Sequence, residues 1–193
     1  MNHNKIKTIA SGLLFALILT CLNTSCTKNK ITQVTNNKEL EQMFYGEWAL
    51  NTRATVELYT DPDTENQKYY GKADILSSNV MSFSENQVYS MKVSSTVEEL
   101  RLTDNALGLE DELTAQLENT ILIHGTFSVD TNYLELLSQT VEVNNSTTYS
   151  AKEYSQIDSR YGAEKQIIKW TLMDDRLEIS DLNENAIVTY NKL

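Results

Sequence analysis

Few side chains in this sequence can do acid–base or nucleophilic chemistry near neutral pH. The 193 residues include two His and two Cys. His124 lies in the apolar stretch of residues 121–125, where an imidazole could serve as a base or a metal ligand. It has no identifiable nucleophile or metal partner, so we expect an outward-facing strand residue beside a turn. Neither a Gly-x-Ser-x-Gly elbow nor a glycine-rich phosphate loop occurs, and we expect no enzyme and no cofactor.

Carboxylates are abundant, and their spacing carries little chemical information. Asp61, Asp63 and Glu65 alternate along one short segment and could offer oxygens to Ca²⁺. The segment lacks the Gly and the distal Glu of an EF-hand loop, so we interpret it as a solvated turn. Asp174 and Asp175 are typical of a hairpin tip. Paired carboxylates for glycoside hydrolysis need only proximity in space, and among 27 acids some pairs are inevitable. We expect no metal site.

Cys26 follows a segment that is typical of protein export. Residues 1–7 carry Lys5 and Lys7, and residues 9–22 form an apolar stretch shorter than the ~20 residues needed to span a bilayer. With the small Ser25 just before Cys26, the segment resembles a bacterial lipoprotein signal. The resemblance implies cleavage before Cys26 and acylation of that residue. Cys21 is a rival lipidation site, and an ordinary secretory signal or an uncleaved anchor is the other alternative.

The charge of the mature chain excludes one class of partner. Removing residues 1–25 leaves 14 Lys and Arg against 27 Asp and Glu. Nucleic acid binding depends on cations that neutralise phosphates, so nucleic acid is not expected as a partner. A basic patch for anionic lipid is equally absent from the composition, and the membrane link should therefore be covalent. Cleavage at Cys26 also leaves no second Cys for a disulfide.

Aromatic side chains offer a different kind of chemistry, because tyrosine packs through its ring and keeps a polar hydroxyl. The chain has ten Tyr. Seven of them could line a sugar- or lipid-binding mouth: Tyr69, Tyr70, Tyr89, Tyr133, Tyr149, Tyr154 and Tyr161. Strand propensity together with ordinary core and surface placement explains the same residues, and we favour that explanation.

The elements that must position these residues are mostly strands. We expect a lipoprotein signal over residues 1–25, a flexible tether over 26–37 and one domain over 38–193. A short helix begins near Asn37, with Leu40, Met43 and Phe44 on one face, and ends at Gly46. The alternation of apolar and polar residues predicts the following strands: 48–59, 69–76, 80–83, 88–93, 120–129, 133–143, 166–172, 177–180 and 186–190.

Three connecting regions carry more specific expectations. Residues 77–79 read as a turn between two strands. Residues 98–118 are ambiguous, because leucines recur at near-helical spacing while Gly108 interrupts them, so a helix and two strand ends remain alternatives. Residues 149–162 predict a helix with Ser150 as its cap and Gly162 as its stop. Eight to nine short strands without a βαβ rhythm indicate an all-β antiparallel barrel or sandwich.

Two motifs carry a resemblance to a known family. Gly46-Glu47-Trp48 follows the short helix and opens the first strand, as the G-x-W signature does in lipocalins. Residues 125–130 followed by 133–136 are similar to a mid-barrel hairpin of lipocalin-like lipoproteins of Bacteroides-type Gram-negative bacteria. The resemblance covers about residues 38–193. It implies an up-and-down barrel of about eight strands, with Trp48 at the closed end. A basic residue of the last strand would pack across that Trp, with Lys192 the nearest match and Arg176 a looser one.

The resemblance also implies a cup that takes a small hydrophobic ligand. From the more apolar face of each strand we expect its lining to include Leu50, Phe83, Tyr89 and Phe127, beside the structural Trp48. The expected protein is a monomer, lipid-anchored at the outer membrane on the periplasmic side or the cell surface. The alternative is a non-catalytic accessory lipoprotein with a filled barrel that acts through protein–protein interaction.

Overall fold

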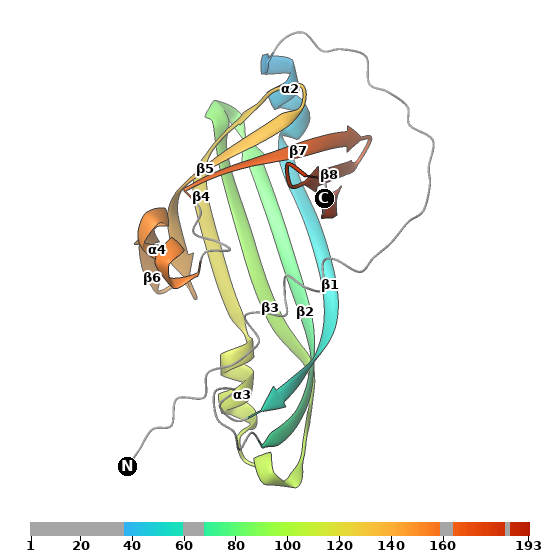
Figure 1. Ribbon diagram of the computed structural model, residues 1–193, viewed down its shortest axis with the longest axis vertical. Coiled ribbons are helices and arrows are strands. Elements are labelled where there is room, and N and C mark those ends of the chain that lie inside the picture. The colour runs from blue at the N-terminus through green and yellow to red at the C-terminus, as the bar shows by residue number, and fades with distance from the viewer. Residues whose placement is uncertain (1–36, 60–67, 159–163, 184–185) are drawn as a thin grey trace. The chain divides into compact units, whose positions relative to one another are not determined.

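The computed structural model describes residues 37–59, 68–158, 164–183 and 186–193 (Figure 1). Several expectations fall outside these ranges and are therefore not addressed by the fold. They concern the export signal, the tether up to residue 36, Cys21 and Cys26, the acidic turn at residues 61–66, Tyr161 and the helix stop at Gly162.

The described residues divide into two compact units. The first, called the barrel unit here, contains residues 37–50, 79–93 and the described residues from 120 onwards. The second, called the helix-covered sheet, contains residues 51–59, 68–78 and 94–119. Three long strands contribute to both units: β1 (Gly46–Tyr59), β2 (Tyr69–Ser84) and β3 (Val88–Leu102).

The barrel unit closes on itself through eight antiparallel strands. Their order around the ring is β1, β2, β3, β4, β5, β7, β8 and β9, and β9 returns to β1. The remaining bounds are β4 (Asn119–Val129), β5 (Tyr133–Val143), β6 (Thr147–Ser150), β7 (Lys165–Met173), β8 (Arg176–Ser180) and β9 (Ile187–Lys192). The short β6 pairs with β5 outside the ring. The expected eight-stranded, up-and-down, lipocalin-like barrel is therefore confirmed.

Two helices belong to the barrel unit. Helix α2 (Asn37–Phe44) buries Leu40 and Phe44, as the periodicity of this segment predicted. Gly46, at φ +119°, turns the chain from this helix into β1 in a backbone conformation that favours glycine. Helix α4 (Ala151–Ile157) begins at Ser150, whose hydroxyl and the Glu153 carboxylate form a reciprocal capping box. Ser150 itself is therefore extended, so the helix begins later than expected, and residues 147–150 form β6.

The helix-covered sheet consists of one sheet layer and one helix. Helix α3 (Glu110–Leu117) follows the short turns η3 (Asp104–Ala106) and Gly108, which adopts φ +92°. Its Leu113 and Leu117 pack with buried side chains of β1 and β2: Val56, Leu58, Ala73 and Ile75. The ambiguous residues 98–118 thus contain the helix, which begins only after Gly108, and one of the two strand ends, since β3 extends to Leu102 while β4 begins at Asn119.

The turn expected at residues 77–79 does not form. β2 runs without a break to Ser84, and η2 (Glu85–Gln87) then connects it to β3. Ser77 is buried. Asn79 lies two residues later on the same face of β2, and the buried Met81 follows two residues after that. Hydrogen bonding to a strand on each side satisfies the backbone here, and this tertiary pairing outweighs the turn preference of Ser and Asn.

Candidate functional site: the interior of the barrel unit

One end of the barrel unit is sealed around Trp48. This residue is 0% exposed, and its indole Nε1–H donates to the carbonyl oxygen of Phe44 at 2.7 Å. Trp48 lies opposite Lys192 in the β1–β9 register, and the Lys192 Nζ is 5.2 Å from the centre of its ring. Lys192 is thus the basic residue of the last strand that packs across the Trp. Arg176 lies opposite Asn191 instead.

Three of the expected lining residues form a packed aromatic floor. Phe83, Tyr89 and Phe127 are at most 2% exposed. The ring centroid of Phe83 lies 5.0 Å from that of Phe127, 6.5 Å from that of Tyr89 and 5.6 Å from that of Phe44. Aromatic rings attract one another at such separations. These inward side chains therefore occupy the space at this end of the barrel, and together with Phe44 they are called the aromatic floor below.

The hydroxyl group of Tyr89 is satisfied within the protein. It lies 2.7 Å from the Ser138 hydroxyl, and either oxygen can be the donor. Burial raises the pKa of the Tyr89 hydroxyl, and the hydrogen bond with Ser138 offsets part of that effect. The ring is also held from β4, because a Cβ at Gly125 would lie 2.7 Å from Tyr89 Cε1. Tyr89 is thus part of the core rather than a free polar group.

Farther along the strands, some inward side chains of the barrel unit are buried, among them Val93, Ile121 and Val141, whereas others are only half-buried. Leu50 on β1, Met91 on β3 and Val143 on β5 all pack against the core cluster while keeping some exposure. On β2, Asn79 occupies the same inner face two residues from Met81, because buried and less buried positions alternate along this strand. Leu50, Asn79, Met91 and Val143 are called the inner zone below. Of these four, only Leu50 was among the expected lining residues.

Asn79 is the chemically distinct member of the inner zone. Its side-chain carbonyl oxygen is buried and has no hydrogen-bond partner among the described residues. An unsatisfied buried acceptor costs about 1–3 kcal/mol, so native proteins usually pair it with protein, water or ligand. The sequence carried one signal for this residue, the alternation Ala73, Ile75, Ser77, Asn79, Met81, but the dipeptide Ser-Asn favoured a turn.

The interior offers no charge to a ligand. Among the described residues, the only buried polar side chains are Ser77 and Ser95, and both belong to the helix-covered sheet. A carboxylate or phosphate placed inside the barrel unit would therefore lack a buried cation to pair with, and burying an unpaired ion is costly. The inner zone suits a neutral molecule.

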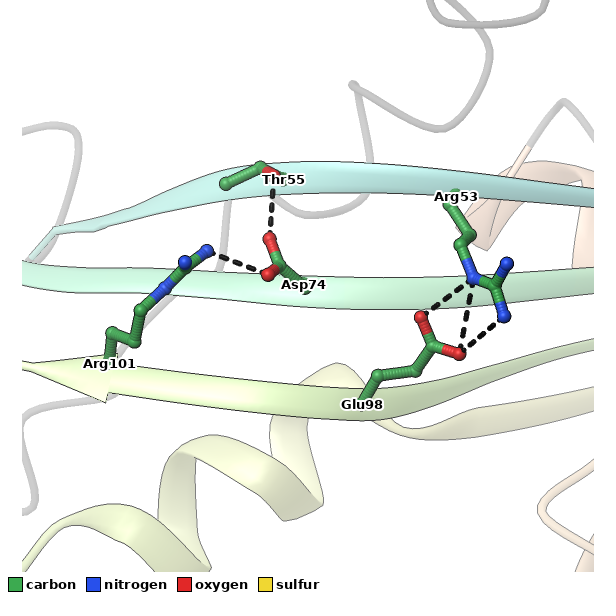
Figure 2. A network of polar contacts seen from close by, with 5 residues as sticks. All are labelled: Arg53, Thr55, Asp74, Glu98 and Arg101. Atoms are coloured by element: carbon green, nitrogen blue, oxygen red, sulfur yellow. Dashed lines mark hydrogen bonds and ion pairs between the residues drawn. The ribbon is translucent and has the colours of Figure 1, made fainter.

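The outer face of the helix-covered sheet carries a cluster of polar contacts (Figure 2). Arg53 on β1 reaches across to Glu98 on β3, with Nε 2.9 Å from one carboxylate oxygen. On β2, Asp74 accepts from Thr55 Oγ1 at 2.6 Å and from Arg101 Nη2 at 2.7 Å. Each of these charges already has a partner of opposite sign, so this cluster stabilises strand pairing and does not resemble a ligand site.

Other residues considered from the sequence do not gather into a site. His124 is exposed and faces outward, as expected, but it lies inside β4 at a register shift with β5 rather than beside a turn. Of the seven tyrosines, Tyr69 and Tyr70 belong to the helix-covered sheet, whereas Tyr89, Tyr133, Tyr149 and Tyr154 belong to the barrel unit. The described part of the chain contains no cluster of three or more His, Cys, Asp or Glu side chains that would hold a metal ion.

No protein-family model matches the chain, and no curated protein sequence does so either. The resemblance to lipocalin-like lipoproteins therefore stays a prediction. Within the described ranges, none of the helices combines the length and the apolar character needed to cross a membrane.

Proposed function

We propose that the barrel unit binds one small, neutral and mainly apolar molecule, and that a lipid on Cys26 tethers the protein to the outer membrane. The unpartnered carbonyl oxygen of Asn79 on the inner face of the barrel carries this proposal. It is an acceptor set among half-buried apolar side chains, which is the composition of many small-molecule sites. A hydroxyl or amide N–H on the ligand would donate a hydrogen bond to this oxygen.

The two zones of the interior define where such a ligand would sit. The aromatic floor is already filled by its own rings, so Phe83, Tyr89 and Phe127 would form the base of the site rather than its walls. Leu50, Met91 and Val143 would supply apolar contact beside Asn79. An eight-stranded barrel has room for one small ligand at most, which agrees with a site confined to part of the interior.

The decisive measurement is native mass spectrometry of protein purified in detergent from its own membranes. We expect a co-purifying neutral molecule that bears a hydroxyl or an N–H group. Asn79→Leu, which replaces the acceptor by an apolar side chain of similar size, should reduce its occupancy about tenfold, since a hydrogen bond in a buried site contributes roughly 1.5 kcal/mol. Asn191→Leu, at an exposed position of β9, is the matched control and should leave occupancy unchanged.

Membrane attachment is tested separately. Cys26→Ala should release the protein from the membrane or leave an uncleaved precursor. Retention with normal processing would transfer the proposal to Cys21. Because the proposed role is binding, it should also survive His124→Ala, and an activity that disappears with His124 in a folded protein would contradict it.

A second candidate is an accessory lipoprotein with a filled barrel that acts through its outer surface. The aromatic floor favours it, because an interior packed in this way needs no ligand for its stability. The same mass spectra decide between the two candidates. If the protein carries no small molecule and Asn79→Leu is more stable than the unchanged chain, the interior is simply a core.

A further inference from the structure

The two edges of the helix-covered sheet differ in how their backbone is protected. On the β3 edge, the Val97 N–H donates to the Glu118 carboxylate at 3.0 Å. Ser95 Oγ on the same strand donates to the Leu117 carbonyl oxygen and accepts from the Asn119 N–H. The last residue of α3 and the two residues that follow it therefore cover this edge at Ser95 and Val97. Such covering prevents an edge strand from pairing with another chain.

The β1 edge has no comparable protection among the described residues. β9 pairs with β1 only at Trp48 and Ala49, so among the described strands residues 51–59 have a partner on the β2 side alone. This nine-residue stretch contains no Pro, Gly or Lys. It also has no charged side chain on its inner face, where Ala54, Val56 and Leu58 lie. A long edge without these features is a template for β-pairing.

The orientation of the free backbone groups follows from β9. The Leu193 N–H donates to the Glu47 carbonyl oxygen at 2.9 Å, so the backbone groups of Glu47 face the β9 side of β1. Side-chain bonds join Glu47 to Ser82 and Thr55 to Asp74, and both strands advance by eight residues between them, which indicates no bulge. Because alternate residues face the same side, Thr55 also presents its N–H and C=O to the free edge.

We propose that this edge pairs with the same edge of a second copy, antiparallel and centred on Thr55. In that register each Thr55 faces its counterpart, and Arg53 of one copy lies opposite Glu57 of the other, twice by symmetry. On the inner face, Ala54 would lie opposite Val56. Isologous pairing of this kind requires a self-complementary surface, and the spacing of Arg53 and Glu57 about Thr55 provides it. The expectation from the sequence was a monomer.

The two charged residues remain able to make this contact. Arg53 uses Nε and Nη2 toward Glu98, and the residue is largely exposed, with 74% of its side chain accessible. Glu57 contacts Lys72 and Tyr59 and is also exposed, so its carboxylate oxygens retain free lone pairs. Opposite charges directly across two antiparallel strands are favourable, whereas like charges there are unfavourable.

Sedimentation velocity of the full chain, purified in detergent, tests this pairing through charge reversal. We expect a dimer that Arg53→Glu or Glu57→Arg weakens about tenfold, because each change places like charges opposite each other at two symmetric positions. The double variant should restore the dimer. Arg101→Glu is the matched control, since Arg101 also pairs with an acid on the outer face but lies on β3, and it should leave dimerisation unchanged.

A cross-link tests the register directly. In an antiparallel pair, facing Cα atoms lie about 5.5 Å apart, which suits a disulfide. Thr55→Cys should therefore form a covalent dimer under mild oxidation, whereas Lys72→Cys, on β2 away from the edge, should not. A protein that sediments as a monomer, a dimer insensitive to both single reversals, or a different polypeptide bound in place of the second copy would each overturn the proposal.

Discussion

The barrel unit and the helix-covered sheet use the same three strands but bury their inner faces differently. In the barrel unit the strands close through β4 to β9, and bulky rings such as Phe83 and Phe127 fill the enclosed space. In the helix-covered sheet no closure occurs among the described residues. There, aliphatic side chains such as Val56 and Ile75 pack against the leucines of α3. Closure removes edges, whereas covering by a helix leaves them to be managed separately.

The difference also appears on the outer faces. The helix-covered sheet carries ion pairs that cross all three strands, from Arg53 to Glu98 and from Arg101 to Asp74 (Figure 2). The barrel unit carries one ion pair between β5 and β7, from Lys165 to Glu135, and beside it exposed apolar residues that include Leu137 and Ile167. An open sheet of few strands gains stability from cross-strand ion pairs, whereas the barrel already has a continuous ladder of backbone hydrogen bonds. Stability should therefore depend on different residues in each unit.

The largest loss of stability should come from a substitution at the sealed end of the barrel unit. Trp48→Ala removes a fully buried ring, the hydrogen bond to Phe44 and the surface on which Lys192 packs. We expect a loss of about 3–5 kcal/mol in the free energy of unfolding, measured by chemical denaturation. If the unfolding midpoint does not change, Trp48 does not stabilise the barrel unit, and the stability of this unit does not depend on its sealed end.

A smaller and more local effect is expected in the helix-covered sheet. Leu113→Ala leaves a cavity under α3, and we expect a cost of about 2–4 kcal/mol. Hydrogen exchange should show earlier opening of α3 and of β2 near Ala73, while amides of β8 keep their protection. Equal loss of protection in both units would mean that they unfold as one cooperative body.

The ion pairs should matter less than either core. Asp74→Ala removes the partner of Arg101 and Thr55, and we expect a cost of about 1 kcal/mol or less because both charges are partly exposed. High salt should reduce the difference between this variant and the unchanged chain. A cost that equals that of Leu113→Ala would show that the outer face, and not α3, holds this sheet together.

The smallest effects should follow acidification, at one carboxylate in each unit. Hydrogen bonds from Ser150 lower the pKa of Glu153, and those from Tyr59 and Lys72 lower the pKa of Glu57. A carboxyl pKa that is lower in the folded chain stabilises the fold above the unfolded pKa, and this contribution is lost as pH falls through the folded value. NMR titration should therefore show both groups protonating below the usual Glu range. Glu153→Gln keeps the geometry of the capping box and should remove only the pH dependence of the stability of α4 that comes from the Glu153 carboxyl group.

Much of the fold followed from the sequence. Period-2 alternation located the strands, with the correct ends of β5, and helical spacing placed Leu40 and Phe44 on one buried face of α2. Ser150 was recognised as a helix cap because its hydroxyl acts locally. Lys192 was the nearest candidate to cross Trp48, and it does. The strands, the helix face and the cap depend on neighbours in the chain, which is why spacing reveals them, whereas the contact of Lys192 with Trp48 joins distant residues and was implied only by the resemblance to lipocalins.

Long-range pairing decided the rest. Ser77 and Asn79 favour a turn locally, but β2 pairs with a strand on each side. This pairing places Asn79 on the inner face, where its side-chain oxygen is an unsatisfied acceptor. Phe83, Tyr89 and Phe127 were expected to face inward, but their mutual contact, which turns a lining into a floor, depends on three strands meeting. The open edge of β1 depends on where β9 ends its pairing. The sequence alone determined which side chains alternate and where local caps lie, whereas closure of the barrel determined what each inward side chain meets, because those contacts join residues far apart in the chain.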